Sequence, residues 1–347
     1  MNTSAAVLVH INKPLIVEEL RLPELSGGQV LVRVAYSGIC HSQLNEIRGL
    51  KGEDRFLPHT LGHEGSGIVE AVGPGVSKVK TGDHAVLTWI KGSGYDVPAA
   101  VYTRSDNTRV NSGAISTFLT RAVISENRVV KIPDALGLKE AALLGCAIPT
   151  GAGIVMNTAQ LAAERSIAIF GMGGIGQAAL LAAKMRGAAA IIAVDVSADK
   201  LARAAALGAT HTVNAAVEDV GQSIKKITQN RGVDYALECA GQIESMEAGY
   251  RCVREKGGLC IIAGNLSSGQ TIRIDPFDLI KGKRILGTWG GETQPDRDIP
   301  LYADMALSGK LDLDQLIGCV FPLDRINDAL GYMEKSSTGR VMIEMSV

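Results

Sequence analysis

The chain has 347 residues, of which 46% are hydrophobic, and its 35 basic and 36 acidic side chains give a formal net charge of −1. That length exceeds what one hydrophobic core usually serves, so we expect two domains that fold without disulfides. The balanced charge excludes the basic surface typical of nucleic-acid and membrane-surface proteins and favours a small-molecule partner. No apolar run reaches membrane-spanning length, the first residues lack a secretory pattern and the six cysteines are scattered, so we expect a cytoplasmic protein.

The first part of the chain, up to about residue 132, alternates short β-rich runs with glycine turns. Runs such as 30–34, 67–72 and 84–87 are rich in aliphatic residues, and Gly-Pro-Gly and Gly-Asp turns separate such runs. This pattern predicts an antiparallel β domain.

From about residue 149 onward, strand-like runs alternate with helical ones. We expect strands over 167–170, 191–195, 210–213, 233–239, 259–263 and 284–287, with helices opening near Gly174, over 198–207, over 217–230 and before 259. Such βαβ alternation predicts a doubly wound parallel sheet. After Gly290 the alternation stops, and we assign a helix near 301–308 and strands over 319–323 and 340–344 to the first domain. The expected domains are therefore 1–148 with 289–347, and 149–288.

A glycine-rich turn lies between the first strand of the expected parallel sheet and the helix that follows it. The turn reads Gly171-Met172-Gly173-Gly174-Ile175-Gly176. Its first glycines let the backbone approach a diphosphate, the helix N-terminus offers unpaired N–H groups, and Gly176 lets the helix pack close to the strand. Between a strand and a helix, this motif predicts a dinucleotide-binding site.

Asp195 ends the next expected strand. A carboxylate there accepts hydrogen bonds from an adenosine ribose and repels a 2′-phosphate, so the sequence favours NAD over NADP. The alternative for Asp195 is a solvent-facing residue at a strand end. Lys200 is either a further ribose contact or an ordinary solvated lysine.

Cys40, His63 and Cys146 are the candidate metal ligands. Alone, each cysteine is more often a packed core residue than a ligand, and His63 alone is ambiguous. Cys40 and His63 lie in glycine-flanked turns of the β domain, and Cys146 lies just before the dinucleotide domain, so the three can converge on a cleft between domains. Two sulfurs and an imidazole suit a catalytic Zn²⁺ with one open position. The remaining cysteines have no ligand spacing, and we expect them to be structural.

The order of the motifs resembles that of the zinc-dependent, medium-chain alcohol dehydrogenase family over nearly the whole chain. The matching motifs are Gly38-Ile39-Cys40-His41-Ser42, Gly62-His63-Glu64-Gly65, Gly82-Asp83, Gly145-Cys146, the glycine turn at 171–176, Asp195 and Gly339-Arg340. The resemblance implies a GroES-like β-rich catalytic domain joined to a Rossmann NAD-binding domain. It also implies hydride transfer between NAD(H) and an alcohol, aldehyde or ketone, and a homodimer or homotetramer paired through the sheet edge at 284–287.

Carried over position by position, the resemblance implies that Cys40, His63 and Cys146 bind the catalytic zinc. Glu64 then lies beside the metal as an outer or exchanging ligand. Ser42 matches the hydroxyl that takes the alcohol proton. The alternative for Ser42 is a turn residue that caps a helix starting near residue 43.

Four further positions match residues of the family that contact cofactor or substrate. His41 and Arg340 fall where family members hold the cofactor diphosphate, and Thr150 falls beside the nicotinamide. Trp89 matches an aromatic wall of the substrate pocket.

The chain departs from the family pattern in three places. Residues 84–121 contain no cysteine, so the structural zinc of many members is missing, and we expect one zinc per chain and a remodelled polar loop over 91–113. Gln43 stands where the family often has an aspartate near the ligand histidine, which leaves the His63 imidazole less electron-rich. Asn45 stands where some members end their proton relay with a histidine.

Three functions remain open from the sequence. The first is an NAD-dependent zinc alcohol dehydrogenase that acts on a primary or secondary alcohol or on the matching carbonyl compound. The second is a zinc dehydrogenase of polyols or sugars, which Glu64 and the polar 91–113 loop permit. The third is a metal-free dinucleotide-binding protein with a structural or regulatory role, which requires the Cys/His/Cys set to be coincidental.

Overall fold

The structure is a computed structural model that describes residues 1–267, 269–335 and 338–345. The chain divides into two compact units, one of Met1–Cys146 with Gln294–Val347 and one of Ala147–Thr293. Residues 147–148 and 289–293, which we expected in the first domain, thus fall in the second unit. The 289–293 segment packs closely against helix α3 of the second unit. The Thr293 hydroxyl donates to the Pro149 carbonyl oxygen at 2.8 Å, and Gly291 comes so close to that oxygen that a Cβ on it would lie 2.6 Å away.

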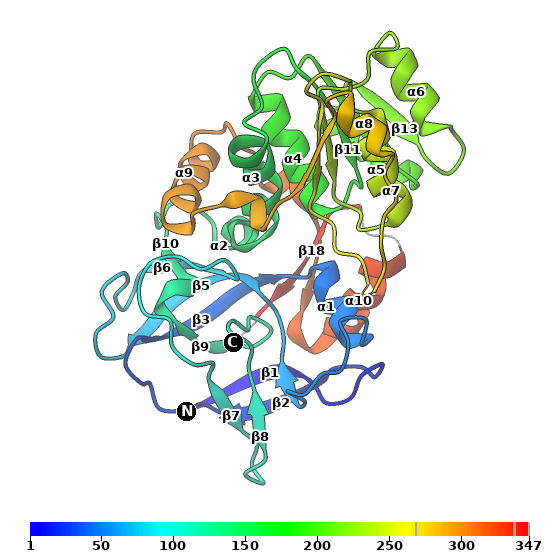
Figure 1. The fold of residues 1–347 in the computed structure, drawn as a ribbon. Helices are drawn as coiled ribbons and strands as arrows, with labels where there is room; N and C mark the ends of the chain where they lie inside the picture. The colour runs from blue at the N-terminus through cyan, green and yellow to red at the C-terminus, as the bar shows by residue number, and fades with distance from the viewer. Residues whose placement is uncertain (268, 336–337, 346–347) are drawn as a thin grey trace. The chain divides into compact units, whose positions relative to one another are not determined.

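The first unit contains two sheets (Figure 1). One is a closed barrel in the order β1-β2-β7-β8-β4, and the other runs β10-β6-β5-β3-β18-β17 with β9 paired to β3. The strands are β1 (Asn2–Leu8), β2 (Ile16–Arg21), β3 (Gln29–Gly38), β4 (His59–Thr60), β5 (Glu64–Val72), β6 (His84–Thr88), β7 (Val101–Thr103), β8 (Arg109–Asn111), β9 (Arg121–Ser125), β10 (Val129–Lys131), β17 (Ile317–Pro322) and β18 (Arg340–Glu344). The expectation of an antiparallel domain is wrong for β4 with β8 and for β17 with β18, which pair in parallel.

Short helices connect these strands. They are α1 (His41–Ile47), α2 (Leu138–Ala141), α9 (Pro295–Leu307) and α10 (Ile326–Lys335), with the single turns η1 (Glu126–Arg128), η2 (Ala142–Gly145), η5 (Asp314–Leu316) and η6 (Leu323–Arg325). Among the described residues, no single helix is long and apolar enough to cross a membrane, and only the bent pair Leu138–Gly145 with Ala147–Thr158 reaches that length and apolar content together.

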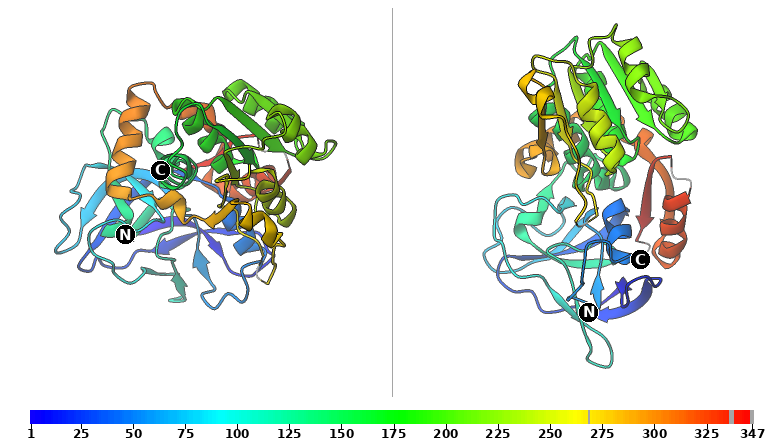
Figure 2. Two further views of the ribbon diagram at one scale, coloured as in Figure 1. Left: turned by 45° about the horizontal axis from the view of Figure 1, so that its top comes forward. Right: turned by 45° about the vertical axis from the view of Figure 1, so that its right-hand side comes forward.

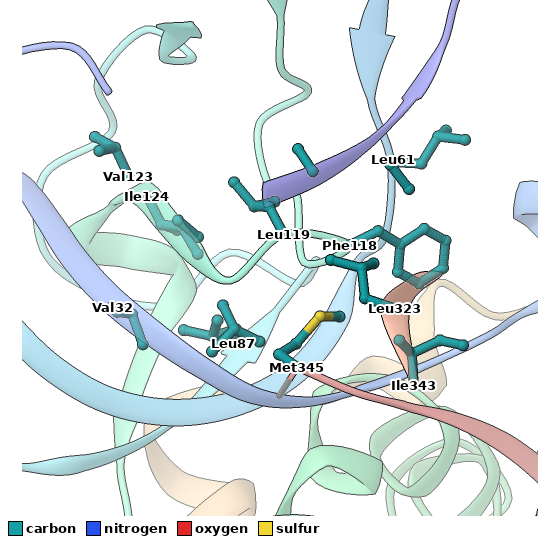
Figure 3. Close-up of a cluster of buried hydrophobic side chains, with 14 of the residues drawn as sticks. Val32, Leu61, Leu87, Phe118, Leu119, Val123, Ile124, Leu323, Ile343 and Met345 are labelled. Atoms are coloured by element: carbon teal, nitrogen blue, oxygen red, sulfur yellow. The ribbon is translucent and has the colours of Figure 1, made fainter. Parts of the chain in front are cut away.

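The C-terminal tail completes the core of the first unit. Strand β18 lies between β3 and β17, with Met342 opposite Gly38. Leu323, Ile343 and Met345 of the tail are buried in one cluster with aliphatic and aromatic side chains from the N-terminal half (Figure 3). The tail therefore belongs to the first unit, although the whole second unit separates the two in sequence.

The second unit is a six-stranded parallel sheet in the order β13-β12-β11-β14-β15-β16, with helices on both faces (Figure 2). The strands are β11 (Ser166–Phe170), β12 (Ala190–Asp195), β13 (His211–Asn214), β14 (Tyr235–Glu238), β15 (Leu259–Ile262) and β16 (Arg284–Gly287). The helices are α3 (Ala147–Gly153), η3 (Ile154–Thr158), α4 (Gly174–Met185), α5 (Ala198–Leu207), α6 (Val220–Ile227), α7 (Ile243–Cys252), α8 (Pro276–Ile280) and η4 (Gly290–Glu292). The strand order is that of a dinucleotide-binding Rossmann sheet, which confirms the predicted fold class.

The buried carboxylate of Glu126 connects two loops, one before β6 and one between β6 and β7. Glu126 accepts the backbone N–H groups of Ser77 at 2.7 Å, Lys78 at 2.9 Å and Tyr95 at 2.9 Å. Burial raises the pKa of Glu126, but the three N–H groups outweigh that effect and lower the pKa overall. The stretch expected as a polar loop over 91–113 thus carries the β7–β8 pair and is anchored by Glu126.

Candidate functional site

Cys40, His63 and Cys146 come together in the first unit. Cys40 precedes α1, His63 directly precedes β5, and Cys146 follows η2. Their ligand atoms all lie within 4.8 Å of one another, and His63 Nε2 is 3.3 Å from Cys146 Sγ. The three side chains therefore form one cluster of two sulfurs and one imidazole.

The two sulfurs interact. Their side-chain interaction lowers the pKa of Cys40 and raises the pKa of Cys146, because a buried pair cannot hold two uncompensated negative charges. A bound cation removes this conflict by compensating both thiolates. The set of donors consequently fits Zn²⁺, which favours thiolate and imidazole ligands.

Gln43 and Ser42 lie against the other ring nitrogen of His63. Gln43 Nε2 is 2.5 Å and Ser42 Oγ is 3.4 Å from His63 Nδ1. The Cys40 N–H donates to Gln43 Oε1 at 2.7 Å, so the Gln43 side chain also caps α1. The alternative in which Ser42 caps this helix is wrong, because the N-cap is Cys40 and Ser42 is already inside the first turn.

Glu64 and Arg340 form a buried ion pair beside the cluster. Arg340 donates to Glu64 Oε2, whereas Glu64 Oε1 has no hydrogen-bond partner among the described residues. Burial raises the pKa of Glu64, and the Arg340 guanidinium opposes that rise. Gly38 leaves room for the carboxyl group, since a Cβ at that position would lie 2.8 Å from the Glu64 carboxyl carbon.

Trp89, His41 and Thr150 lie in different surroundings. Trp89 follows β6, and its ring meets the His63 ring edge-on with centroids 6.4 Å apart. His41 is the exposed first residue of α1. Thr150 is buried in α3 of the second unit, and its hydroxyl has no hydrogen-bond partner among the described residues. The structure therefore brings Trp89 to the cluster and leaves His41 on the surface of its unit.

The glycine turn joins β11 to α4 in the second unit, with Gly173 as the N-cap. A Cβ at Gly176 would lie 1.9 Å from the Gly171 carbonyl oxygen, so only glycine allows this close approach of helix and strand. The turn and the end of β12 line a groove of about 1380 Å³ that includes Gly171 and Asp195. The helix N-terminus, which Gly174 and Ile175 open, is suited to an anion.

Asp195 braces the turn. Its carboxylate accepts the backbone N–H groups of Met172 at 2.7 Å and Ser197 at 2.9 Å. The backbone N–H of Lys200 donates to Ser197 Oγ, and the Lys200 side chain is half-buried. Asp195 thus lines the groove and also holds the backbone of the glycine turn.

Two groupings of side chains were not predicted from the sequence. One is the Glu64–Arg340 pair; the resemblance implies a place beside the metal for Glu64 and a contact to the cofactor diphosphate for Arg340, but no contact between the two. The other is the group His59, Asp54 and Glu46, in which His59 Nε2 is 2.8 Å from Asp54 Oδ2. No motif or spacing indicates either one, because each depends on how distant loops pack.

Comparisons with known proteins agree with this geometry. Residues 26–134 match the model of the alcohol dehydrogenase GroES-like domain, and residues 174–307 match that of the zinc-binding dehydrogenase domain. The chain is 31% identical to alcohol dehydrogenase 1 of Pisum sativum over 98% of this chain and 96% of that protein.

Two solved structures are similar over 100% of this chain and of their own, both at 32% identity. They are an alcohol dehydrogenase zinc-binding domain protein from Burkholderia ambifaria, with a TM-score of 0.93, and benzyl alcohol dehydrogenase from Acinetobacter calcoaceticus, with a TM-score of 0.90. With its Cys/His/Cys cluster and its Rossmann sheet, the chain therefore belongs to the zinc-dependent alcohol dehydrogenases of the medium-chain dehydrogenase family.

Proposed function

We propose that this oxidoreductase transfers hydride between an alcohol, or the matching aldehyde or ketone, and NAD(H), using one zinc ion per chain. The observation that carries the proposal is the meeting of Cys40, His63 and Cys146 within 4.8 Å. These three side chains would hold the ion, which supplies Lewis acidity for the substrate oxygen. The absence of any cysteine in 84–121 supports a single zinc.

Metal analysis of the purified protein, combined with an NAD-reduction screen over alcohols, tests this function. The expected result is about one zinc per chain and NAD reduction with at least one alcohol. A reproducible content near two zinc ions per chain would contradict the single site. Full activity with no metal would contradict the zinc mechanism.

The alcohol proton leaves through Ser42 in this proposal. Its hydroxyl lies 3.4 Å from Nδ1 of His63, one of the proposed metal ligands. Because the Asn45 amide cannot exchange a proton near neutral pH, Ser42 would pass the proton outward to a group other than Asn45, and a ribose hydroxyl of bound NAD and water would be available for this. Glu64 acts beside the metal as an outer or exchanging ligand, and the lack of a partner for its Oε1 among the described residues supports that role.

The cofactor is NAD in this proposal, and the Asp195 carboxylate selects it through the ribose. The glycine turn takes the diphosphate, with His41 and Arg340 as cationic contacts and Thr150 beside the nicotinamide. Arg340 is paired with Glu64, so its share in cofactor binding requires that its remaining N–H groups face the diphosphate.

Trp89 forms an aromatic wall of the substrate pocket in this proposal, which its edge-on contact with His63 supports. The similarity to a benzyl alcohol dehydrogenase favours placing aromatic alcohols in the screen beside aliphatic ones. The second candidate is a dehydrogenase of polyols or sugars, favoured by the buried Glu64 next to the cluster. Faster turnover of polyols than of simple alcohols would establish that candidate.

We also propose that the chain forms a dimer or tetramer in the cytoplasm. Strand β16 lies at the edge of the parallel sheet, and unpaired strand edges favour pairing with a second copy. The exposed Phe277 and Ile280 of the neighbouring α8 add apolar surface. Light scattering tests the assembly, and a monomer at micromolar concentration would contradict it. The six free thiols support a reducing compartment.

A further inference from the structure

The Gln43 amide lies between the Cys40 backbone and the His63 ring. The Gln43 side chain is buried, and its two polar atoms face different partners. Oε1 lies 2.7 Å from the Cys40 backbone nitrogen, and Nε2 lies 2.5 Å from His63 Nδ1. A backbone N–H can only donate, so the oxygen of the amide must be the atom that faces Cys40.

This orientation determines the tautomer of His63. With Oε1 directed at Cys40, the amide presents an N–H donor to His63 Nδ1, which must then be the unprotonated, accepting nitrogen. The ring proton is left on Nε2, from which it points at Cys146 Sγ, 3.3 Å away. In the metal-free chain the Cys40 N–H, one Gln43 N–H and the ring N–H of His63 then each face an acceptor.

That tautomer is the wrong one for a metal ligand. His63 Nε2 faces the two sulfurs and would be the atom that binds zinc, which requires a free lone pair on Nε2 and the proton on Nδ1. An Nδ1–H would then point at the Gln43 NH₂ group, donor against donor. Turning the amide over only moves the conflict to the Cys40 N–H.

We propose that Gln43 is a positioning residue that holds His63 in the Nε2–H tautomer and thereby weakens zinc binding, and that Ser42 Oγ accepts the Nδ1–H when zinc is bound. Besides the Gln43 amide, the Ser42 hydroxyl is the polar group of the described residues that lies near His63 Nδ1, with Oγ at 3.4 Å. This inference rests on the proposed zinc site. It adds that the amide makes the site looser than a carboxylate would, since a carboxylate can accept from Cys40 and from His63 at once.

The test variant is Gln43→Glu, which has the same shape and two accepting oxygens. It should bind zinc about 10- to 100-fold more tightly than the wild type in a chelator competition, the range typical of groups that orient a ligand histidine. The matched control is Gln222→Glu, which makes the same change at the third position of helix α6 in the other unit, and its zinc affinity should equal that of the wild type. If Gln43→Glu binds zinc no more tightly than the wild type and the Gln222→Glu control do, the inference is wrong.

The Ser42 part is tested by a double-mutant cycle. Ser42→Ala should weaken zinc binding in the wild type, where it removes the acceptor for Nδ1–H, and should have little effect beside Gln43→Glu. Equal effects in both backgrounds would contradict the role given to Ser42.

The tautomer itself is read from ¹⁵N chemical shifts of the histidine rings in the metal-free wild type, so this measurement does not depend on how the variants fold. The expected spectrum shows His63 with a protonated Nε2 and an unprotonated Nδ1, and zinc should reverse the two. A protonated Nδ1 in the metal-free protein would overturn the inference. If no variant binds zinc, the proposed function fails, and the metal-free spectrum still decides the tautomer.

Discussion

Glu126→Gln should destabilise the first unit, because it removes the carboxylate that holds the segment next to β7. The Glu126 side chain is 1% exposed, and its two oxygens share three backbone donors. Oε1 accepts from Ser77 and Lys78, and Oε2 accepts from Tyr95. An amide has one oxygen in place of two and therefore cannot serve all three donors.

The less costly orientation of the new amide leaves one donor, the Tyr95 N–H, facing an NH₂ group. An unsatisfied buried donor costs about 1–3 kcal/mol, and the two hydrogen bonds that remain lose the advantage of a charged acceptor, about 1 kcal/mol each. Relief from burying a charge offsets part of this. We therefore expect the free energy of unfolding to fall by about 2–4 kcal/mol at pH 7.

The assay is urea unfolding followed by tryptophan fluorescence. The chain has two tryptophans, one in each unit, so a Trp289→Phe background leaves Trp89 to report on the first unit alone. The control is Glu53→Gln, which makes the same change on a side chain that is 75% exposed. It should change the unfolding free energy by less than about 0.5 kcal/mol.

The pH dependence supplies a second criterion. Because the folded-state pKa of Glu126 is lowered, its contribution is complete above the unfolded-state pKa of about 4.3 and disappears as the pH falls through the lower folded-state value. The deficit of Glu126→Gln should therefore stay constant from pH 7 to about pH 5 and shrink as the pH falls to about 3. A variant as stable as Glu53→Gln at pH 7, or a deficit independent of pH, would refute the reasoning.

Three further outcomes are expected. Ser42→Ala should slow alcohol oxidation about 10²- to 10⁴-fold, and Asn45→Ala should change it little. Steady-state rates of both variants over pH 6 to 10 measure this. Nearly full turnover by Ser42→Ala with a large loss in Asn45→Ala would contradict the proton path. Replacing Asp195 with alanine should weaken NAD and relatively favour NADP, which kcat/KM for both cofactors measures; equal use of both by the wild type would contradict the selection. Burial raises the pKa of Asp234, but hydrogen bonds from Ser166 and Arg254 lower it overall. Asp234→Asn should thus cost about 1–3 kcal/mol at neutral pH and less as the pH falls below about 4, and chemical unfolding at pH 7 and at about pH 3 will show whether the difference narrows.

Local signals in the sequence define both ends of helix α5. Helix α5 spans 198–207 as expected, because Ser197 caps its start and Gly208 adopts the left-handed conformation, with φ of 115°, after its end. Helix α9 starts at Pro295, before the expected 301, because proline fits the first turn of a helix, whereas the polar stretch around it looks like a loop. Periodicity alone misses such a start.

The candidate site combines features that a sequence can predict with others that it cannot. Residue type and glycine context are local, so the amino-acid sequence alone is enough to select Cys40, His63 and Cys146 as candidate ligands. The direction of a hydrogen bond is not local. The sequence is enough to mark Gln43 as a departure from the family pattern. That its NH₂ group faces His63 Nδ1 depends on the Cys40 N–H, which donates to the amide oxygen. Likewise, Glu64 and Arg340 meet only because β18 pairs with β3.

The place of β18 in the middle of its sheet has a consequence for biosynthesis. Strand β3 is made early, but its neighbour β18 follows roughly 300 residues later, which is about 15–60 s at typical rates of translation. The second unit, which is continuous in sequence, can fold during that wait, whereas the first unit is left with an open sheet. Arg340 is on β18, so the buried Glu64 has no counter-ion until the ribosome has released this last strand. A nascent chain can therefore complete its second unit before the sheet that carries the Glu64–Arg340 pair.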